Sequence, residues 1–507
     1  NYNVVVGDEA GTAITTGDDN TALGMEALKT ATTATTNTAI GRATLKLTTT
    51  GTANTAVGYA ALLNNTTASN NTAVGDQALL ANTTGDRNVA MGGLALDANT
   101  TASSNTAVGY ASLTANTTGA SNVAVGQGAL QANTTASNNN AFGVGALAAN
   151  TTGSANNAFG LSALAATTTP NHNSGFGSSA LQANTTGANN SSFGSNALAA
   201  NTTADNNTAV GYFSLAANTT GASNTAVGRQ ALLSNTTGTQ NVSLGGDSLE
   251  ANTTGDYNVA FGVNALKANT TASNNTGIGK SALAANTTGS GNVAVGSGAL
   301  DANTTGYNNA SLGTSSLGAN TTGTENVAVG SNALDACTTG NTNVGIGVNS
   351  LGALTTGSGN TAIGDDSVAS GVVTGNYNTA LGNSSMDALT SGTLNVGVGR
   401  SALASNTTAS NNTAVGASAL TANTTGTGNT AVGMSALLSN TDANSNSALG
   451  FGALQTNTTG AGNSAFGYSA LNANTTASNN TAVGYASLVA NTTGDRNVAL
   501  GAYALDA

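Results

Sequence analysis

The chain has 507 residues, of which 6% are charged and 4% are aromatic, and its formal net charge is −12. This negative net charge comes from few groups spread along a long chain, and it disfavours a nucleic-acid partner. With one His and one Cys, the chain cannot assemble a His-based triad or a His/Cys metal site, so we expect neither an enzyme nor a cofactor.

One repeated unit accounts for nearly the whole chain. A large apolar residue directly before a glycine recurs with a 17-residue period from Val6 to Ile363, slips by one residue, and continues from Leu381 to Leu500, which makes 30 units. The unit at 71–87 reads NTAVGDQALLANTTGDR, and we number its places from 1 to 17. A fixed period of this length is the signature of a solenoid or an array. We therefore predict a single continuous domain over residues 1–507, with the slip near 365–378.

The unit at 71–87 predicts short strands joined by turns. We expect a strand around Thr72–Val74, a turn at Gly75, a second strand around Ala78–Leu80 and a turn at Asn82–Gly85. Such a unit is too short for two helices and a turn, and Gly, Thr and Asn are poor helix formers. The sequence therefore predicts an all-β fold, a parallel β-solenoid (β-roll) of about 30 coils with one coil per unit.

The structural repeat positions are those of Val74, Gly75, Leu79, Asn82 and Thr83 and their equivalents in other units. Place 5 is glycine in all 30 units, which predicts a positive φ angle or no room for a Cβ. We expect the large apolar residues of places 4 and 9 to form inward-facing columns, beside the small residue of place 3. The Asn residues of places 1 and 12 are expected to form amide ladders between stacked coils.

The slip interrupts the pattern of place 12. One additional residue within 364–378 fits a bulged turn. Around it, place 12 loses Asn in four successive units, at Cys337, Leu354, Gly371 and Leu389. We interpret this as local repacking, with a recognition surface as the alternative.

One pair of acids is a candidate for a catalytic site. Glu9 and Glu26 occupy place 7 of adjacent units, and a glycosidase needs two carboxylates across a groove. A solvated patch explains these two residues better. A hydrolytic spike is therefore only a third hypothesis.

Asn-Thr-Thr at places 12 to 14 is an N-glycosylation sequon. Asn65, Asn82, Asn99 and Asn116 are therefore possible glycosylation sites. The alternative is that Asn occupies this place because tight turns favour it.

A column of threonines runs along place 13. It extends from Thr15 to Thr492, with only Val372 interrupting it. Such a ladder could bind ice or present hydroxyls to carbohydrate. The alternative is that Thr simply suits a solvent-facing strand.

Units such as Asn105–Gly109 and Asn412–Gly416 resemble the head repeat of trimeric autotransporter adhesins (YadA-like heads), and similar repeats occur in some phage tail fibres. The resemblance implies a left-handed parallel β-roll, three chains side by side, and a surface that binds host matrix or cells. It also implies that Val108 and Leu113 line the roll. The unit of this chain is longer than the usual head repeat.

We therefore expect an extracellular structural fibre or adhesin shaft, on a cell or virion surface. Neither end departs from the repeat as a capping unit would, so we expect self-association, as a homo-oligomer or a head-to-tail filament, or a longer parent protein. Host surfaces or glycans are further candidate partners. No apolar run approaches the roughly 20 residues of a membrane helix, so no membrane insertion is expected. The alternative function is an ice- or carbohydrate-binding solenoid that uses the threonine ladders.

Overall fold

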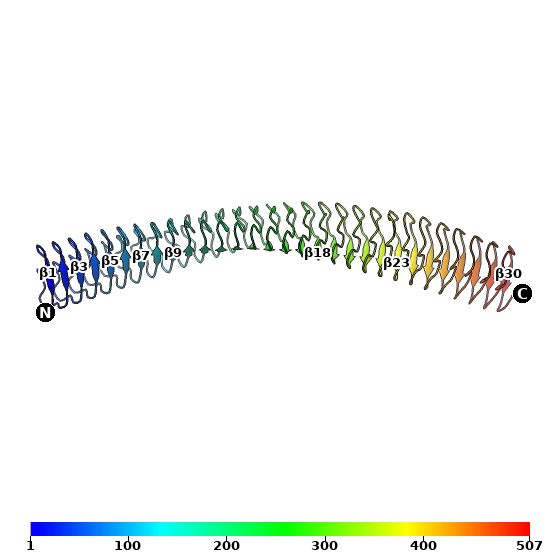
Figure 1. Ribbon diagram of the computed structural model, residues 1–507, viewed down its shortest axis with the longest axis horizontal. Helices are drawn as coiled ribbons and strands as arrows, with labels where there is room; N and C mark the ends of the chain where they lie inside the picture. Colours follow the sequence, from blue (N-terminus) through cyan, green and yellow to red (C-terminus); the bar gives the residue numbers. More distant parts are fainter. Residues whose placement is uncertain (1, 507) are drawn as a thin grey trace. The chain divides into compact units, whose positions relative to one another are not determined.

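The computed structural model describes residues 2–506, which form strands, turns and bends with no helix among them. The chain divides into two compact units, Asn1–Thr254 and Gly255–Ala507. Each unit is a parallel β-solenoid with 15 three-residue strands, one in each coil (Figure 1). The predicted all-β solenoid with a 17-residue repeat is confirmed, whereas the single continuous domain stays a prediction.

The strands of the first unit are β1 (Val4–Val6), β2 (Thr21–Leu23), β3 (Thr38–Ile40), β4 (Thr55–Val57), β5 (Thr72–Val74), β6 (Val89–Met91), β7 (Thr106–Val108), β8 (Val123–Val125), β9 (Asn140–Phe142), β10 (Asn157–Phe159), β11 (Ser174–Phe176), β12 (Ser191–Phe193), β13 (Thr208–Val210), β14 (Thr225–Val227) and β15 (Val242–Leu244).

The strands of the second unit are β16 (Val259–Phe261), β17 (Thr276–Ile278), β18 (Val293–Val295), β19 (Ala310–Leu312), β20 (Val327–Val329), β21 (Val344–Ile346), β22 (Thr361–Ile363), β23 (Thr379–Leu381), β24 (Val396–Val398), β25 (Thr413–Val415), β26 (Thr430–Val432), β27 (Ser447–Leu449), β28 (Ser464–Phe466), β29 (Thr481–Val483) and β30 (Val498–Leu500).

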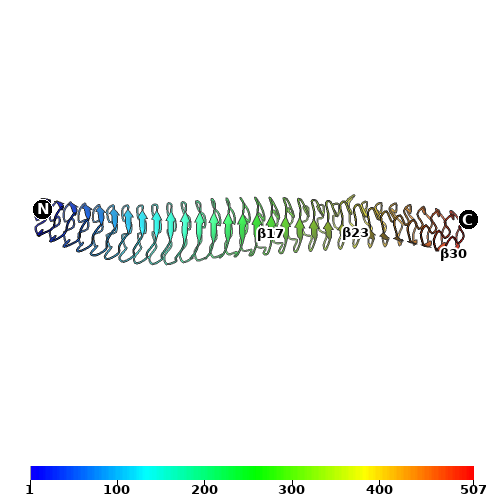
Figure 2. The same ribbon diagram turned by 90° about the horizontal axis from the view of Figure 1, so that it is seen from below.

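Within each unit, every strand pairs in parallel with the strand of the next coil. Strand β5 pairs with β6 so that Thr72 lies opposite Val89 and Val74 lies opposite Met91, an offset of one complete repeat. Figure 2 shows these strands side by side in successive coils. Equivalent places therefore stack directly above one another, so the repeated sequence forms continuous columns of equivalent side chains.

The glycine of place 5 ends each strand. Gly75 has a φ of 141°, and a Cβ built on it would lie 2.5 Å from the carbonyl oxygen of Gly92 in the next coil. Both predicted reasons for glycine therefore hold, because the backbone conformation disfavours an L side chain and the neighbouring backbone leaves no room.

The second strand predicted around Ala78–Leu80 is wrong, because this segment is a turn. Gln77 and Leu79 have left-handed backbone conformations, with φ angles of 55° and 56°. Their N–H groups point to opposite neighbours: that of Gln77 donates to the Tyr59 carbonyl of the previous coil at 2.8 Å, and that of Leu79 to the Ala95 carbonyl of the next coil at 2.9 Å. Hydrogen bonding between coils therefore continues through this turn, although its residues do not have strand geometry. These hydrogen bonds offset the cost of the left-handed backbone conformation, which is about 1–2 kcal/mol per residue.

The prediction that place 4 faces inward is also wrong. Alternate residues of a strand face opposite sides, so the Asn of place 1 and the Ala of place 3 point inward together. Ala73 is fully buried, whereas the place-4 residues Leu23 and Met91 are 47% and 45% exposed. The apolar interior is therefore built from the small residues of places 3 and 8 and the Leu of place 9, which confirms the inward column predicted for place 9.

The two residues that the resemblance assigns to the lining of the roll also differ in this way, since one occupies the inward-facing place 9 and the other the outward-facing place 4. Leu113 is fully buried inside its coil. Val108 lies on the outer face of its strand and is only half-buried, so it does not line the interior.

The slip lies between Val368 and Val373. Strand β22 pairs with β23 so that Thr361 lies opposite Thr379, one residue beyond the usual offset. Gly371, which counting assigns to place 12, lies in an exposed bulge, and Val373 is fully buried and bridges to Leu354 instead. The additional length therefore projects outward, and a neighbouring valine fills the interior position.

Candidate functional site

Two asparagine columns hold the coils together from inside, as predicted. The backbone N–H and the Nδ2 of Asn122 (place 1) donate to Asn105 Oδ1 of the previous coil at 2.9 and 3.2 Å. The Nδ2 atoms of Asn105 and Asn116 (place 12) both donate to the carbonyl oxygen of Gly119, at 2.9 and 3.0 Å. A coil with Asn at both places thus uses two buried amides to hold the carbonyl of its own place 15.

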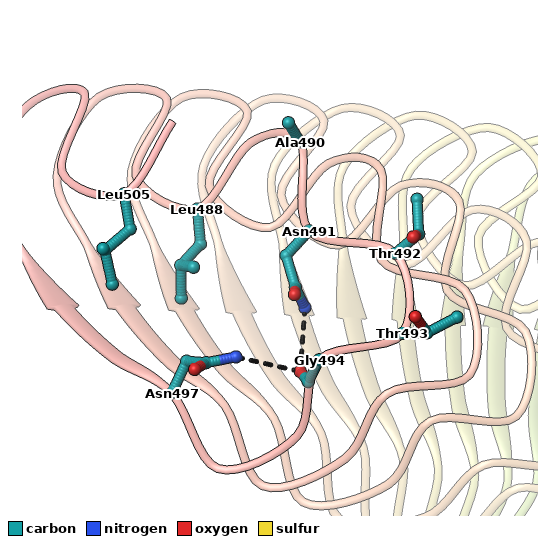
Figure 3. Close-up of a pocket in the computed structure, with 8 residues that line it drawn as sticks. All are labelled: Leu488, Ala490, Asn491, Thr492, Thr493, Gly494, Asn497 and Leu505. Atoms are coloured by element: carbon teal, nitrogen blue, oxygen red, sulfur yellow. Dashed lines mark hydrogen bonds between the residues drawn. The ribbon is translucent and has the colours of Figure 1, made fainter. Parts of the chain in front are cut away.

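Figure 3 shows this interior around a cavity of about 330 Å³ in the coils near residue 490. The side chains of Leu488 and Leu505 belong to successive coils and lie beside each other. Asn491 and Asn497 both donate to the carbonyl oxygen of Gly494, at 3.0 and 3.1 Å. The hollow is lined by the same apolar and amide columns that fill the other coils, but here the columns are open to solvent, since Leu505 is 59% exposed.

The predicted sequon asparagines belong to this buried ladder. Asn65, Asn82, Asn99 and Asn116 are all fully buried. The Nδ2 of Asn99, the atom to which a glycan would be attached, donates to Asn82 Oδ1 at 2.9 Å. A folded coil therefore offers no access to these nitrogens, and glycosylation stays a prediction that concerns the chain before it folds.

Interruptions of the place-12 ladder leave polar atoms unsatisfied, which counting residues does not reveal. The Oδ1 atoms of Asn150 and Asn320 are buried and have no hydrogen-bond partner. In each case the next coil lacks Asn at place 12, because Thr167 and Cys337 stand there. At these two interruptions of the ladder, a buried amide oxygen is left without a partner.

Cys337 should be inert towards thiol reagents in the folded protein. Its side chain is fully buried, and burial raises the pKa of its thiol to about 11. Because the thiolate is the reactive form, labelling with iodoacetamide at pH 8 should require unfolding. The control is Thr84→Cys in a Cys337→Ser background, which should react at once because place 14 is exposed. Equal labelling rates in the two folded proteins would contradict this account.

The outer face of the strands carries the large apolar residues of place 4, which we call the place-4 column. In the first unit it includes a stack of four phenylalanines, Phe142, Phe159, Phe176 and Phe193, with successive ring centroids 4.7, 4.6 and 4.8 Å apart. Phe193 is still 42% exposed. A contiguous exposed apolar surface of this kind marks an interaction site in many soluble proteins.

The threonine column of place 13 is tied into the backbone ladder. The hydroxyl of Thr83 donates to the carbonyl oxygen of Thr100 in the next coil at 3.1 Å, so each hydroxyl has a fixed direction. The neighbouring Thr84 at place 14 is exposed. Ordered hydroxyls and free hydroxyls therefore lie in adjacent rows.

Glu9 and Glu26 are linked by lysines and do not face each other across a groove. Lys29 pairs with both carboxylates, and Lys46 pairs with Glu26 at 2.8 Å. Hydrogen bonds from Lys46 and then Lys29 lower the pKa of Glu26 below its usual value. A catalytic acid needs the opposite shift, so this pair is an ion-pair network on the surface.

An acidic hollow of about 470 Å³ lies beside the bulge. It contains Asp335, Asp366 and Asp387, of which Asp366 accepts a hydrogen bond from Asn349 at 3.1 Å and Asp387 accepts one from Ser370 at 2.8 Å. Within residues 2–506, no group of three or more His, Cys, Asp or Glu side chains is placed to hold a metal ion. The hollow therefore has no ligand set for a metal.

No protein-family model matches the chain, and no curated protein matches it either. Among residues 2–506 we find no helix that could span a lipid bilayer.

Proposed function

We propose that the chain is the shaft of an extracellular structural fibre or adhesin, built from stacked coils and associating with copies of itself. The observation that carries the proposal is the pairing of a continuous internal ladder with the outward place-4 column. The ladder supports stiffness along each unit, since every coil is bonded to the next through both backbone and buried amides. The resemblance to the head repeats of trimeric adhesins and to phage tail fibres is a second reason.

The place-4 column is a suitable surface for lateral contact between copies. It holds a large apolar residue in every coil, and a place-4 residue such as Phe193 is 42% exposed. A partner that matches it over many coils must repeat with the spacing of the Phe stack, 4.6–4.8 Å. A second copy of the same chain meets this condition automatically.

Charges placed on this column should separate the copies. In the double variant Phe159→Glu and Phe176→Glu, association would bury two unpaired carboxylates, so we expect binding between copies to weaken at least about 100-fold. Negative-stain microscopy and light scattering of the purified chain should show assemblies for the wild type and single chains for the variant. The matched control is Thr169→Glu and Thr186→Glu, which alters the exposed place 14 of the same coils. Wild-type protein that stays single at all concentrations would overturn the proposal of lateral assembly.

An ice-binding solenoid is a second candidate, favoured by the fixed hydroxyls of place 13 next to the exposed row of place 14. Regular rows of hydroxyl and methyl groups are suited to holding ordered water. Thermal hysteresis of a concentrated solution tests this function directly. An effect no larger than that of an unrelated protein at equal mass concentration would exclude it.

A further inference from the structure

One part of the first unit has a surface without charge. Between Asp97 and Asp205 the sequence contains no Asp, Glu, Lys or Arg. The polar groups in this stretch are amides and hydroxyls, together with a single tyrosine, Tyr110, and a single histidine. A ligand bound here would meet neutral hydrogen-bonding groups and aromatic or aliphatic side chains.

A hollow of about 250 Å³ lies in this uncharged stretch, between places 6, 7 and 10 of three successive coils. It exists because place 7 is glycine in two coils running, at Gly128 and Gly145. Elsewhere glycine occupies place 7 only in single coils, at Gly298 and Gly452, and the remaining coils carry a side chain there, such as Gln77 or Asn196. The volume is below the roughly 300 Å³ at which sites for drug-sized ligands begin, so it suits one small ring.

Tyr110 forms one wall of the hollow. Its ring is 58% exposed and lies over Gly93 of the previous coil, where a Cβ would meet ring atom Cδ2 at 3.6 Å. The glycine therefore lets the ring lie close to the backbone. Val144, which is 51% exposed, lies two coils further along and adds an apolar contact.

Two glutamine amides complete the lining. Gln127 and Gln131 are both exposed. The Oε1 of Gln131 lies 3.4 Å from the position that a Cβ on residue 128 would take, so this amide extends over Gly128 into the hollow. Each amide offers two N–H donors and one acceptor oxygen.

We propose that this hollow binds a single neutral sugar ring. The C–H groups on one face of a pyranose pack against the Tyr110 ring, and its hydroxyls exchange hydrogen bonds with the amides of Gln127 and Gln131. An anionic sugar would find no cationic partner among the residues of this stretch, so neutral saccharides are preferred. The site does not depend on fibre formation, because all its residues belong to coils of one chain.

The test uses the full 507-residue chain and saturation-transfer NMR with the methyl glycosides of glucose, galactose, mannose and N-acetylglucosamine. Sialic acid serves as the charged comparison. Tyr110→Ala removes the wall of the hollow. Gly128→Asn fills it, and the backbone accepts this change because Asn264 adopts a φ of 60° at the same place. The matched control is Tyr212→Ala, since Tyr212 also occupies place 6 and is 55% exposed.

At least one neutral glycoside should bind the wild type and the Tyr212→Ala variant with equal affinity. Its affinity should fall at least about tenfold in Tyr110→Ala and in Gly128→Asn, while the circular dichroism of both stays that of the wild type. The inference is overturned by three outcomes: no neutral glycoside binds, sialic acid alone binds, or Tyr212→Ala loses as much affinity as Tyr110→Ala.

Discussion

Replacing Gly109 by alanine should cause a large loss of stability, as should the same change at the other glycines of place 5. Gly109 has a φ of 135°, and a Cβ there would lie 2.6 Å from the carbonyl oxygen of Gly126 and 2.7 Å from its carbon. Backbone strain and steric overlap together should cost about 3–5 kcal/mol. Because each coil contacts only its neighbours, the damage should be local. Native-state hydrogen exchange should show the amide of Gly126, which donates to the Val108 carbonyl at 2.8 Å, losing most of its protection.

Gly128→Ala is the matched control for this variant. Gly128 has a φ of 64°, and a Cβ there would meet only Gln131 Oε1, at 3.4 Å. Alanine already adopts this conformation at the same place, as at Ala60 with a φ of 52°. Gly128→Ala should therefore leave protection unchanged. Equal protection in the two variants would show that the close approach of stacked place-5 backbones is not a real constraint.

Thr167→Asn should stabilise the protein by about 1–3 kcal/mol, which is the usual cost of a buried polar atom left without a partner. The Oδ1 of Asn150 and the hydroxyl of Thr167 are both buried and unsatisfied. Asparagine at 167 would donate to Asn150 Oδ1, and its own Oδ1 would accept from Asn184 in the next coil. Thermal unfolding, together with hydrogen exchange of the coils around residue 167, measures the gain.

Cys337→Asn tests whether the gain comes from completing the ladder. This change would supply a donor to the unsatisfied Oδ1 of Asn320. The next coil, however, presents the buried side chain of Leu354, so the new Oδ1 would be unsatisfied in its turn. We expect no net stabilisation. A gain equal to that of Thr167→Asn, or a loss of stability in Thr167→Asn, would contradict the account of the ladder.

Several features of the fold follow from the sequence because they repeat in every coil. The period sets the register of strand pairing, and an invariant glycine such as Gly75 indicates a backbone constraint. The Asn columns and the buried Leu79 follow from the stacking of identical places. In each case the same physical requirement recurs in every coil, so the same residue type recurs at the same place of the unit.

Two predictions, the inward orientation of place 4 and the strand around Ala78–Leu80, are wrong because the same sequence pattern is compatible with two different structures. The size of Val74 suggested an interior residue, but strand alternation places Ala73 inside, because the buried Asn of place 1 fixes which residues face inward. The left-handed conformation of Leu79 could not be predicted, since leucine has no preference for it and only the hydrogen bonds of adjacent coils stabilise it.

Features of the candidate sites depend on contacts between coils, and the pattern of one unit does not contain them. The sequon at Asn82 is readable in the sequence, but its burial depends on the amide of Asn99 in the next coil. At the slip, the 17-residue period assigns Gly371 to place 12, but in the structure Val373 fills the interior position. The hollow beside Tyr110 needs two glycines in successive coils, and only stacking brings their places together.

The central claim is that each repeat makes one coil and that successive coils rise by one strand spacing. Nitroxide labels at Thr84→Cys and Thr186→Cys, in a Cys337→Ser background, lie at the exposed place 14 of coils six repeats apart. Stacking at about 4.7 Å per coil predicts a narrow distance distribution near 28 Å by pulsed electron paramagnetic resonance. A broad distribution centred near about 55 Å, as expected for an unfolded segment of this length, would contradict the account.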